Sequence, residues 1–287
     1  MKNKIILGSA NFDQTYGISK NFIDKIEIKK LLDLASRNKI KVIDTSPTYG
    51  KSEKIIGTLN KNRFKVISKI SIKIKNRKKN INSWVKKSVK DSLHNLKIKN
   101  LECSLLQNAN SLLGKDGDRI YKSLKNVKKI GLTNKIGISI YDFDILDKIL
   151  KKFKFDLVQA PFNIVDQRLF KTGWLNILKK KKIEVHARST FLQGILLLKY
   201  NQIPKKLKKF NKSWKIWENW LKKNKLNSLQ ACLSFVFNQH ALDGVVIAHN
   251  SKKDLKKNLE IIRKNKSVFT ISDLKIKQSK FIDPRKW

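Results

Sequence analysis

Short runs of β-branched and other apolar residues alternate with amphipathic segments along almost the whole chain. In the amphipathic segments the apolar residues recur at helical spacing, as Ile28, Leu31, Leu32 and Ala35 do. Eight apolar runs are predicted as strands, at residues 5–7, 42–44, 64–70, 101–106, 136–140, 155–161, 183–187 and 244–248. Strict alternation of strands and helices predicts parallel strands joined by right-handed crossovers.

Eight such units in 287 residues favour a closed (β/α)8 barrel, or TIM barrel, whose usual length is about 250 residues. The alternative is an open, doubly wound sheet. That class normally carries a G-x-G-x-x-G turn after its first strand, and this sequence does not. We therefore predict one α/β domain over residues 1–287, with a core at about 4–262 and a short tail at 263–287.

The seventh and eighth predicted strands are separated by an unusually long connection, residues 189–227. Its apolar residues Leu207, Phe210, Trp214, Trp217 and Leu221 follow a helical spacing, which predicts an inserted helix after the seventh strand. Tryptophans interleaved with lysines can stack on nucleic-acid bases. A stripe of this kind is more typical of the face by which a helix docks, and docking is the interpretation we favour.

Charge is the most unusual feature of the composition. The formal net charge is +43, and 57 of the 65 basic residues are lysines. Nucleic-acid recognition generally uses arginine as well as lysine. Lysine, asparagine and isoleucine, all abundant here, share A/T-rich codons, so a coding bias explains the charge and nucleic-acid binding is not expected. A surface that binds polyanions stays open as an alternative.

Three further features bear on the class of protein. The apolar runs are far shorter than the roughly 18 residues that a membrane span needs. An apolar run begins only four residues after Met1, which leaves no room for a signal peptide. Cys103 and Cys232 are the only cysteines, and the four histidines have no metal-ligand spacing. We predict a cytoplasmic protein without a metal.

Polar residues stand at the ends of the predicted strands, where a parallel barrel has its active site. They are Asp44 and Tyr49, Lys69, Gln107, Ser139, Gln159 and Asn163, and Arg188 with Ser189. A phenol is a poor acid at neutral pH, but an ammonium group beside it stabilises the phenolate. Asp44 would keep the Lys69 amine charged, and Tyr49 could then protonate an oxyanion as hydride reaches a carbonyl carbon. Taken singly, each residue has an ordinary structural alternative. Asp44 could cap a turn, Lys69 could be one of many surface lysines, and the Tyr49 ring could simply pack.

The segment Asp44-Thr45-x-x-x-Tyr49-Gly50-x-Ser52-Glu53-x-x-x-Gly57 resembles the signature of the aldo/keto reductases. The opening Leu7-Gly8-Ser9-Ala10-Asn11-Phe12-(x)3-Tyr16-Gly17-Ile18 is similar to the start of a bacterial branch of that family. Looser similarities follow in the expected order at residues 136–139, 158–163, 191–194, 247–258 and 282–287, so the resemblance spans nearly the whole chain.

The resemblance implies a catalytic group of Asp44, Tyr49 and Lys69, with Tyr49 as the general acid. It also implies a nicotinamide cofactor across the barrel mouth. The residues that would bind this cofactor are Ser139, Gln159, Arg188, Ser189, Phe191, Gln193, Gly194, Asn250, Ser251, Asp254 and Asn258. A helix starting at Ser251 would attract a phosphate. Lys252 or Lys253 could add charge for a 2′-phosphate, so NADP(H) is favoured and NAD(H) is the alternative.

Three positions depart from the family pattern. Gln107 stands where the family usually has a catalytic histidine, and an amide can donate a hydrogen bond but cannot carry a charge. Arg188 stands where many relatives stack an aromatic ring on the nicotinamide, although a guanidinium can stack as well. Asp254 replaces the Arg or Gln that relatives often place near the adenine ribose phosphate, which weakens the preference for NADP(H).

The leading hypothesis is an NAD(P)H-dependent oxidoreductase that reduces an aldehyde or ketone on a small molecule. A sugar-derived or anionic substrate would suit the family branch and the basic connection at 189–227. The second hypothesis is a barrel that binds the cofactor but turns over weakly or not at all, because of Gln107, and serves as a sensor or regulatory protein. The third is a polyanion-binding protein, whose binding would depend steeply on salt. The sequence does not predict the oligomeric state.

Overall fold

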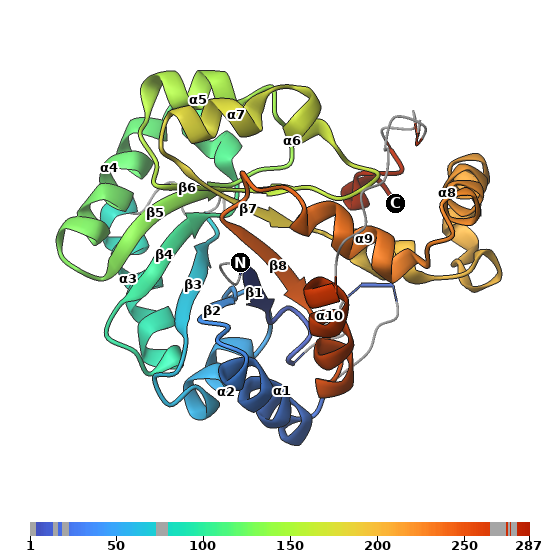
Figure 1. Cartoon of the computed structure of the whole chain (residues 1–287). Helices are drawn as coiled ribbons and strands as arrows, with labels where there is room; N and C mark the ends of the chain where they lie inside the picture. Colours follow the sequence, from blue (N-terminus) through green and yellow to red (C-terminus); the bar gives the residue numbers. More distant parts are fainter. Residues whose placement is uncertain are drawn as a thin grey trace.

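The strands form a closed barrel in which every neighbouring pair is parallel and β8 pairs with β1 (Figure 1). The computed structural model describes residues 4–13, 17–18, 23–72, 80–264, 274, 276 and 280–287. The strands are β1 (Ile5–Gly8), β2 (Val42–Asp44), β3 (Lys65–Ile70), β4 (Leu101–Leu106), β5 (Thr133–Ser139), β6 (Leu157–Pro161), β7 (Glu184–Arg188) and β8 (Gly244–Ala248). The predicted barrel is therefore confirmed.

Helices surround the barrel as a ring (Figure 1). Those of the described residues are α1 (Lys25–Arg37), α2 (Ser52–Leu59), α3 (Ile81–Leu96), α4 (Gly117–Lys129), α5 (Leu146–Lys152), α6 (Arg168–Lys171), α7 (Trp174–Lys180), α8 (Asn211–Lys223), α9 (Ser228–Phe237) and α10 (Lys252–Lys264). Short 3-10 turns lie at Ala109–Leu113, Leu192–Leu197, Tyr200–Gln202, Lys205–Phe210 and Pro284–Lys286.

Local sequence explains where these helices start and which face they bury. The Asp24 side chain accepts a hydrogen bond from Glu27 N, which caps α1, and the Asn80 side chain accepts from two backbone N–H groups at the start of α3. The apolar stripe of α1, which begins at Ile28, is fully buried against the barrel. The helices therefore turn their apolar residues inward and their lysines outward, as the periodicity predicts.

Strand boundaries differ from the predicted ones by a few residues. β5 begins at Thr133, three residues earlier than predicted, because Thr133 pairs with Leu101 of β4. Phe155 was predicted to open the sixth strand, but it lies before β6 and its ring meets Tyr121 of α4 edge-on. Cross-strand hydrogen bonding, rather than apolar character alone, decides where a strand ends.

The inserted helix is present as α8, which lies at the periphery of the molecule (Figure 1). Trp214, Trp217 and Trp220 are all buried, and Trp217 donates a hydrogen bond to the Leu196 carbonyl. Phe281 of the tail meets the Trp214 ring edge-on at 6.4 Å. The docking interpretation is confirmed, and the alternative that these three tryptophans stack on bases is wrong because their rings are covered.

Some sequence features fall outside the described residues. They include Tyr16 of the opening motif and most of the tail between residues 265 and 279. Within the described residues, no helix is both long and apolar enough to cross a membrane.

Candidate functional site

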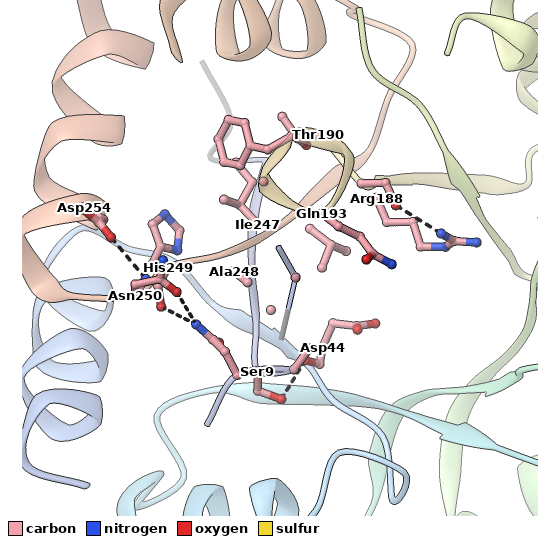
Figure 2. Close-up of a pocket in the computed structure, with 18 of the residues that line it drawn as sticks. Ser9, Asp44, Arg188, Thr190, Gln193, Ile247, Ala248, His249, Asn250 and Asp254 are labelled. Carbon is pink, nitrogen blue, oxygen red and sulfur yellow. Dashed lines mark hydrogen bonds between the residues drawn. The ribbon is translucent and has the colours of Figure 1, made fainter. Parts of the chain in front are cut away.

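One cavity of about 790 Å³ opens at the carboxyl ends of the strands. Fourteen of the fifteen predicted site residues line it: Asp44, Tyr49, Lys69, Gln107, Ser139, Gln159, Arg188, Ser189, Phe191, Gln193, Gly194, Asn250, Asp254 and Asn258. Figure 2 shows Asp44 at the bottom of this cavity, Asn250 and Asp254 at its left, and Arg188 and Thr190 at its upper right. The barrel thus brings together residues that are more than 200 positions apart in the chain.

Asp44 and Lys69 form a buried ion pair at the base of the cavity. The Lys69 ammonium donates to Asp44 Oδ1 at 2.5 Å and to the Thr45 carbonyl at 2.9 Å. Gln159 donates its amide to the other carboxylate oxygen, Oδ2, at 2.8 Å. The Ser9 hydroxyl, in turn, donates to the Asp44 carbonyl. The carboxylate therefore has a charged partner on one oxygen and a neutral one on the other, which fixes its orientation.

The Lys69 ammonium remains charged although it is buried. Burial alone would lower the pKa of Lys69, but Asp44 and Tyr49 outweigh burial and raise it above its usual value. Its nitrogen lies 5.1 Å from the centre of the Tyr49 ring. The half-buried phenol of Tyr49 thus has a permanent positive charge beneath it, open to the cavity on its other side.

Residues of the signature that do not line the cavity hold its walls in place through hydrogen bonds and close packing. The Ser52 hydroxyl donates to Ser9, and the buried Glu53 carboxylate accepts from the Ser68 hydroxyl of β3. Gly57 lets α2 approach α3 closely, since a Cβ there would stand 2.1 Å from the Asn95 carbonyl oxygen. These contacts hold the end of β2, and with it Asp44 and Tyr49, against its neighbours.

Gln107 lies at the end of β4 with its side-chain oxygen buried and without a hydrogen-bond partner among the described residues. Three other cavity-lining residues carry buried polar atoms in the same condition: Asn11, Thr190 and His249. Buried polar atoms usually have partners, so four such residues around one cavity indicate a polar ligand.

The loop after β7 has an unusual backbone. Ser189, Leu192 and Gln193 have positive φ angles of 63°, 47° and 56°. The Gln193 carbonyl accepts a hydrogen bond from Ile18 N, so the loop after β7 is tied to the loop after β1 across the cavity. The Arg188 guanidinium donates to the Ile140 carbonyl and lies 3.9 Å from the centre of the Tyr141 ring. Its stacking partner in this structure is Tyr141.

The start of α10 forms the far end of the cavity. Ser251 does not line the cavity; its hydroxyl accepts a hydrogen bond from Asp254 N and caps the helix. The Asp254 carboxylate accepts from Asn250 N at 3.2 Å, which resembles a capping box shifted by one residue. Asn258, one turn further along, is buried and faces the cavity.

Sequence analysis missed several residues that line the cavity, notably Asn11 and His249. Both follow strands, β1 and β8, so the rule that selected the other strand ends would have found them. The Asn11 amide donates to the His249 carbonyl and to Asn250 Oδ1, which joins the first and last strand ends. Burial lowers the pKa of His249 to about 4, so the imidazole is neutral near pH 7.

Among the residues that the structure describes, no group of three or more His, Cys, Asp or Glu side chains is arranged to hold a metal ion. Cys103 and Cys232 are buried and unpaired, and burial raises the pKa of both thiols.

The aldo/keto reductase family model matches residues 4–278. The chain belongs to the aldo/keto reductase family. Among solved structures it resembles the aldo-keto reductase AKR11C1 of Bacillus halodurans in its holo form, with a TM-score of 0.72 and 16% identity over 97% of this chain and 90% of that one. It also resembles PA4992 of Pseudomonas aeruginosa, described as an aldo-keto reductase, with a TM-score of 0.64 and 19% identity over 90% and 89% of the two chains. At these identities the structures support the fold alone. No curated protein sequence matches the chain.

Membership of this family carries the general chemistry of an oxidoreductase that reduces small-molecule carbonyl groups with a nicotinamide cofactor. The cavity fits such a group in size and in polarity. Its volume lies within the range of about 300–1,000 Å³ that small-molecule sites occupy. Asn11, Gln107, Thr190 and His249, whose buried polar atoms lack a partner among the described residues, all line it, as a polar ligand requires.

Proposed function

We propose that this chain reduces an aldehyde or ketone on a small molecule, with NAD(P)H as the reductant and Tyr49 as the general acid. The observation that carries the proposal is the buried Lys69–Asp44 ion pair beneath the Tyr49 ring. Isolated surface lysines are common in this sequence, but a lysine that is only 5% exposed needs a reason. Stabilising a phenolate at the moment of proton transfer is such a reason.

Proton transfer follows from this geometry. The Tyr49 hydroxyl donates its proton to the substrate oxygen as negative charge develops there, and the Lys69 ammonium stabilises the phenolate that remains. Asp44 compensates the buried charge of Lys69, and Gln159 holds the carboxylate in place. Gln107 offers an amide hydrogen bond to the same substrate oxygen, in the position where the family usually has histidine.

A nicotinamide cofactor, when bound, supplies the hydride that reaches the carbonyl carbon. Ser139 and Gln159 would hold its carboxamide, and Arg188 and Ser189 lie beside them. The loop that contains Phe191, Gln193 and Gly194 would lie along the pyrophosphate. Asn250, Asp254 and Asn258 would hold the adenosine, with Ser251 acting on them as a helix cap rather than as a direct contact.

A polar substrate, such as a sugar-derived carbonyl compound, suits the lining around Gln107, Tyr141 and Arg188. Residence in the cytoplasm stays a prediction.

The test uses the wild type, Tyr49→Phe and the control Tyr121→Phe. Tyr121 lies on α4 outside the cavity and donates to the Lys154 carbonyl, so the control removes a phenol hydroxyl that the chemistry does not use. Each protein is titrated with NADPH and NADH by quenching of tryptophan fluorescence, and is then assayed with a panel of aldehydes and ketones. We expect all three to bind the nucleotide. Turnover should fall about 10²–10⁴-fold in Tyr49→Phe alone.

Two outcomes contradict the proposal in different ways. If the wild type binds neither nucleotide, the assignment as a reductase fails altogether. If the nucleotides bind but no carbonyl compound is reduced by the wild type, the sensor hypothesis replaces catalysis, with Gln107 as its physical basis.

A further inference from the structure

The amino end of α10 is already occupied by carboxylates of this chain. The N–H of Lys252, the first residue of the helix, donates to Glu27 Oε1 at 2.7 Å. Glu27 belongs to α1, 225 positions earlier in the chain, and its side chain is 26% exposed. The N–H of Asn250 donates to the Asp254 carboxylate, and the N–H of Asp254 donates to the Ser251 hydroxyl. Three backbone donors that could hold a phosphate therefore point at side chains of the protein itself.

The charges at this helix end oppose a phosphate. A phosphate group at this helix end would meet the Asp254 carboxylate, which lines the cavity, and would have to displace it from Asn250 N. Glu27 does not line the cavity and pairs with Lys30 at 3.8 Å, but its carboxylate occupies the Lys252 N–H that a phosphate would need.

Lys257 lines the cavity, whereas Lys252 and Lys253 do not. All three lysines are exposed, so water and salt screen their charges and reduce what each can contribute.

His249 adds an independent observation at the same end of the cavity. It is only 2% exposed and it lines the cavity next to Asn250. Its ring meets the Ile247 backbone, but neither ring nitrogen has a well-formed hydrogen bond among the described residues. A neutral imidazole offers one donor and one acceptor. That pair matches a hydroxyl group, which also donates and accepts, better than a phosphate, which only accepts.

We infer that Glu27 and Asp254 make the adenosine end of the cavity selective for an unphosphorylated ribose, so that the chain prefers NAD(H) to NADP(H). This inference rests on the proposed function, because it assigns the cofactor of the same site. It reverses the preference that Lys252 and Lys253 suggest in the sequence, since neither of these lysines lines the cavity, whereas Asp254 does and Glu27 accepts from the first N–H of the helix.

The experiment compares the wild type with the double variant Glu27→Gln/Asp254→Asn. Both substitutions remove a negative charge but keep a side-chain oxygen that can accept the same backbone hydrogen bond, so the helix cap is preserved. Glu260→Gln is the matched control, because Glu260 is an exposed carboxylate of α10 at a distance from its amino end. Dissociation constants for NADH and NADPH are measured by calorimetry at low and at high salt, and unfolding temperatures check that the variants fold.

We expect the wild type to bind NADH at least about tenfold more tightly than NADPH, and the double variant to lower this ratio of dissociation constants by at least about tenfold. The control should behave as the wild type. High salt should widen the wild-type preference for NADH, because it weakens the attraction of the exposed lysines for the extra phosphate.

Other results overturn the inference. Wild-type binding of NADPH that equals or exceeds that of NADH overturns it and leaves the proposed function standing. A preference for NADH that the double variant retains shows that the two carboxylates are not its cause. Binding of neither nucleotide is a different failure, because it removes the proposed function itself.

Discussion

Lys69 and Asp44 are each almost completely buried, with side chains 5% and 4% exposed. Removing two charges from water is costly, and their mutual attraction offsets this cost only if the geometry is good and the remaining polar atoms are satisfied. Here the ammonium also donates to the Thr45 carbonyl, and the carboxylate also accepts from Gln159. Such a pair adds little net stability, but breaking it leaves one charge buried without its partner.

Lys69→Met should therefore lower the free energy of unfolding by about 3–5 kcal/mol, because Asp44 stays buried with only a neutral partner. Lys65→Met is the matched control. It removes a lysine from the same strand whose side chain is 66% exposed and pairs with Glu102, so we expect a loss of less than about 1 kcal/mol. Urea denaturation at pH 7 measures both. Equal losses in the two variants would contradict the assignment of Lys69 as half of a buried pair.

Which residues occupy the site was predictable, because strand ends can be located from the pattern of apolar runs. Their hydrogen-bond partners were predictable only in part. The hydrogen bond that the Gln159 amide donates to Asp44, 115 positions away, was not predicted, and its place at the nicotinamide stays a prediction. The capping pattern at Ser251 was predictable, and its hydroxyl accepts from Asp254 N as a helix cap does. A hydrogen bond between distant residues depends on how strands and helices are aligned with one another, and the pattern of apolar runs does not indicate this alignment.

At the scale of elements, the site depends on how closely neighbouring helices pack. Gly57, at the end of the signature that begins at Asp44, lies in α2 where α3 passes. A Cβ on Gly57 would stand 2.1 Å from the Asn95 carbonyl oxygen and 2.8 Å from the Leu96 carbonyl carbon. These are backbone atoms, so they cannot move aside without shifting the helix. The glycine is needed for close approach of the two helices.

Gly57→Ala should destabilise the protein by about 1–3 kcal/mol, in spite of the gain of about 1 kcal/mol that alanine gives in a helix interior. The neighbouring exposed Thr58→Ala is the control, and it should be neutral or slightly stabilising, because alanine forms helix better than threonine. Thermal unfolding of the two variants distinguishes them. If Gly57→Ala is as stable as the wild type, α2 and α3 do not pack as closely as the structure shows.

The sequence predicted the presence and order of the strands and helices better than any other feature of the structure. The alternation of apolar runs predicted all eight strands. The stripe of Leu207, Phe210, Trp214, Trp217 and Leu221 predicted α8, in which both of these tryptophans are buried. Element ends were less predictable, because they depend on pairing, as at Thr133. The contact between α1 and the amino end of α10, through Glu27, was not predictable at all, because closing the barrel is what brings these helices together.

At the scale of the whole molecule, lysine side chains lie almost entirely at the surface and apolar side chains form the core. Among the described residues, Lys69 is the one lysine that is buried, and every other described lysine is at least partly exposed. This distribution agrees with the coding-bias explanation, in which lysine fills solvated helix faces. Closure of the barrel buries a few polar groups. It brings the ends of β1 and β8 together, and His249 at the end of β8 is only 2% exposed.

This burial should make folding stability depend on pH through His249. Its pKa is about 4 in the folded protein, because burial disfavours the charged imidazole, and about 6.5 in the unfolded chain. The unfolded state therefore binds the proton more readily. The stability that neutral His249 permits is fully present above about pH 6.5 and is lost as pH falls from about 6.5 to about 4.

Between pH 7 and pH 5 the loss due to His249 should be about 2 kcal/mol. His249→Leu removes the titrating group, so the free energy of unfolding of this variant should fall by about 2 kcal/mol less than that of the wild type over the same interval. Some dependence on pH should remain, because burial also lowers the pKa of His186. His94→Gln, at an exposed position on α3, serves as the control and should follow the wild type. Parallel wild-type and His249→Leu curves in urea titrations at the two pH values would mean that His249 is solvated or paired in solution. The two ring nitrogens would then no longer count as free partners for a ligand at the adenosine end of the cavity.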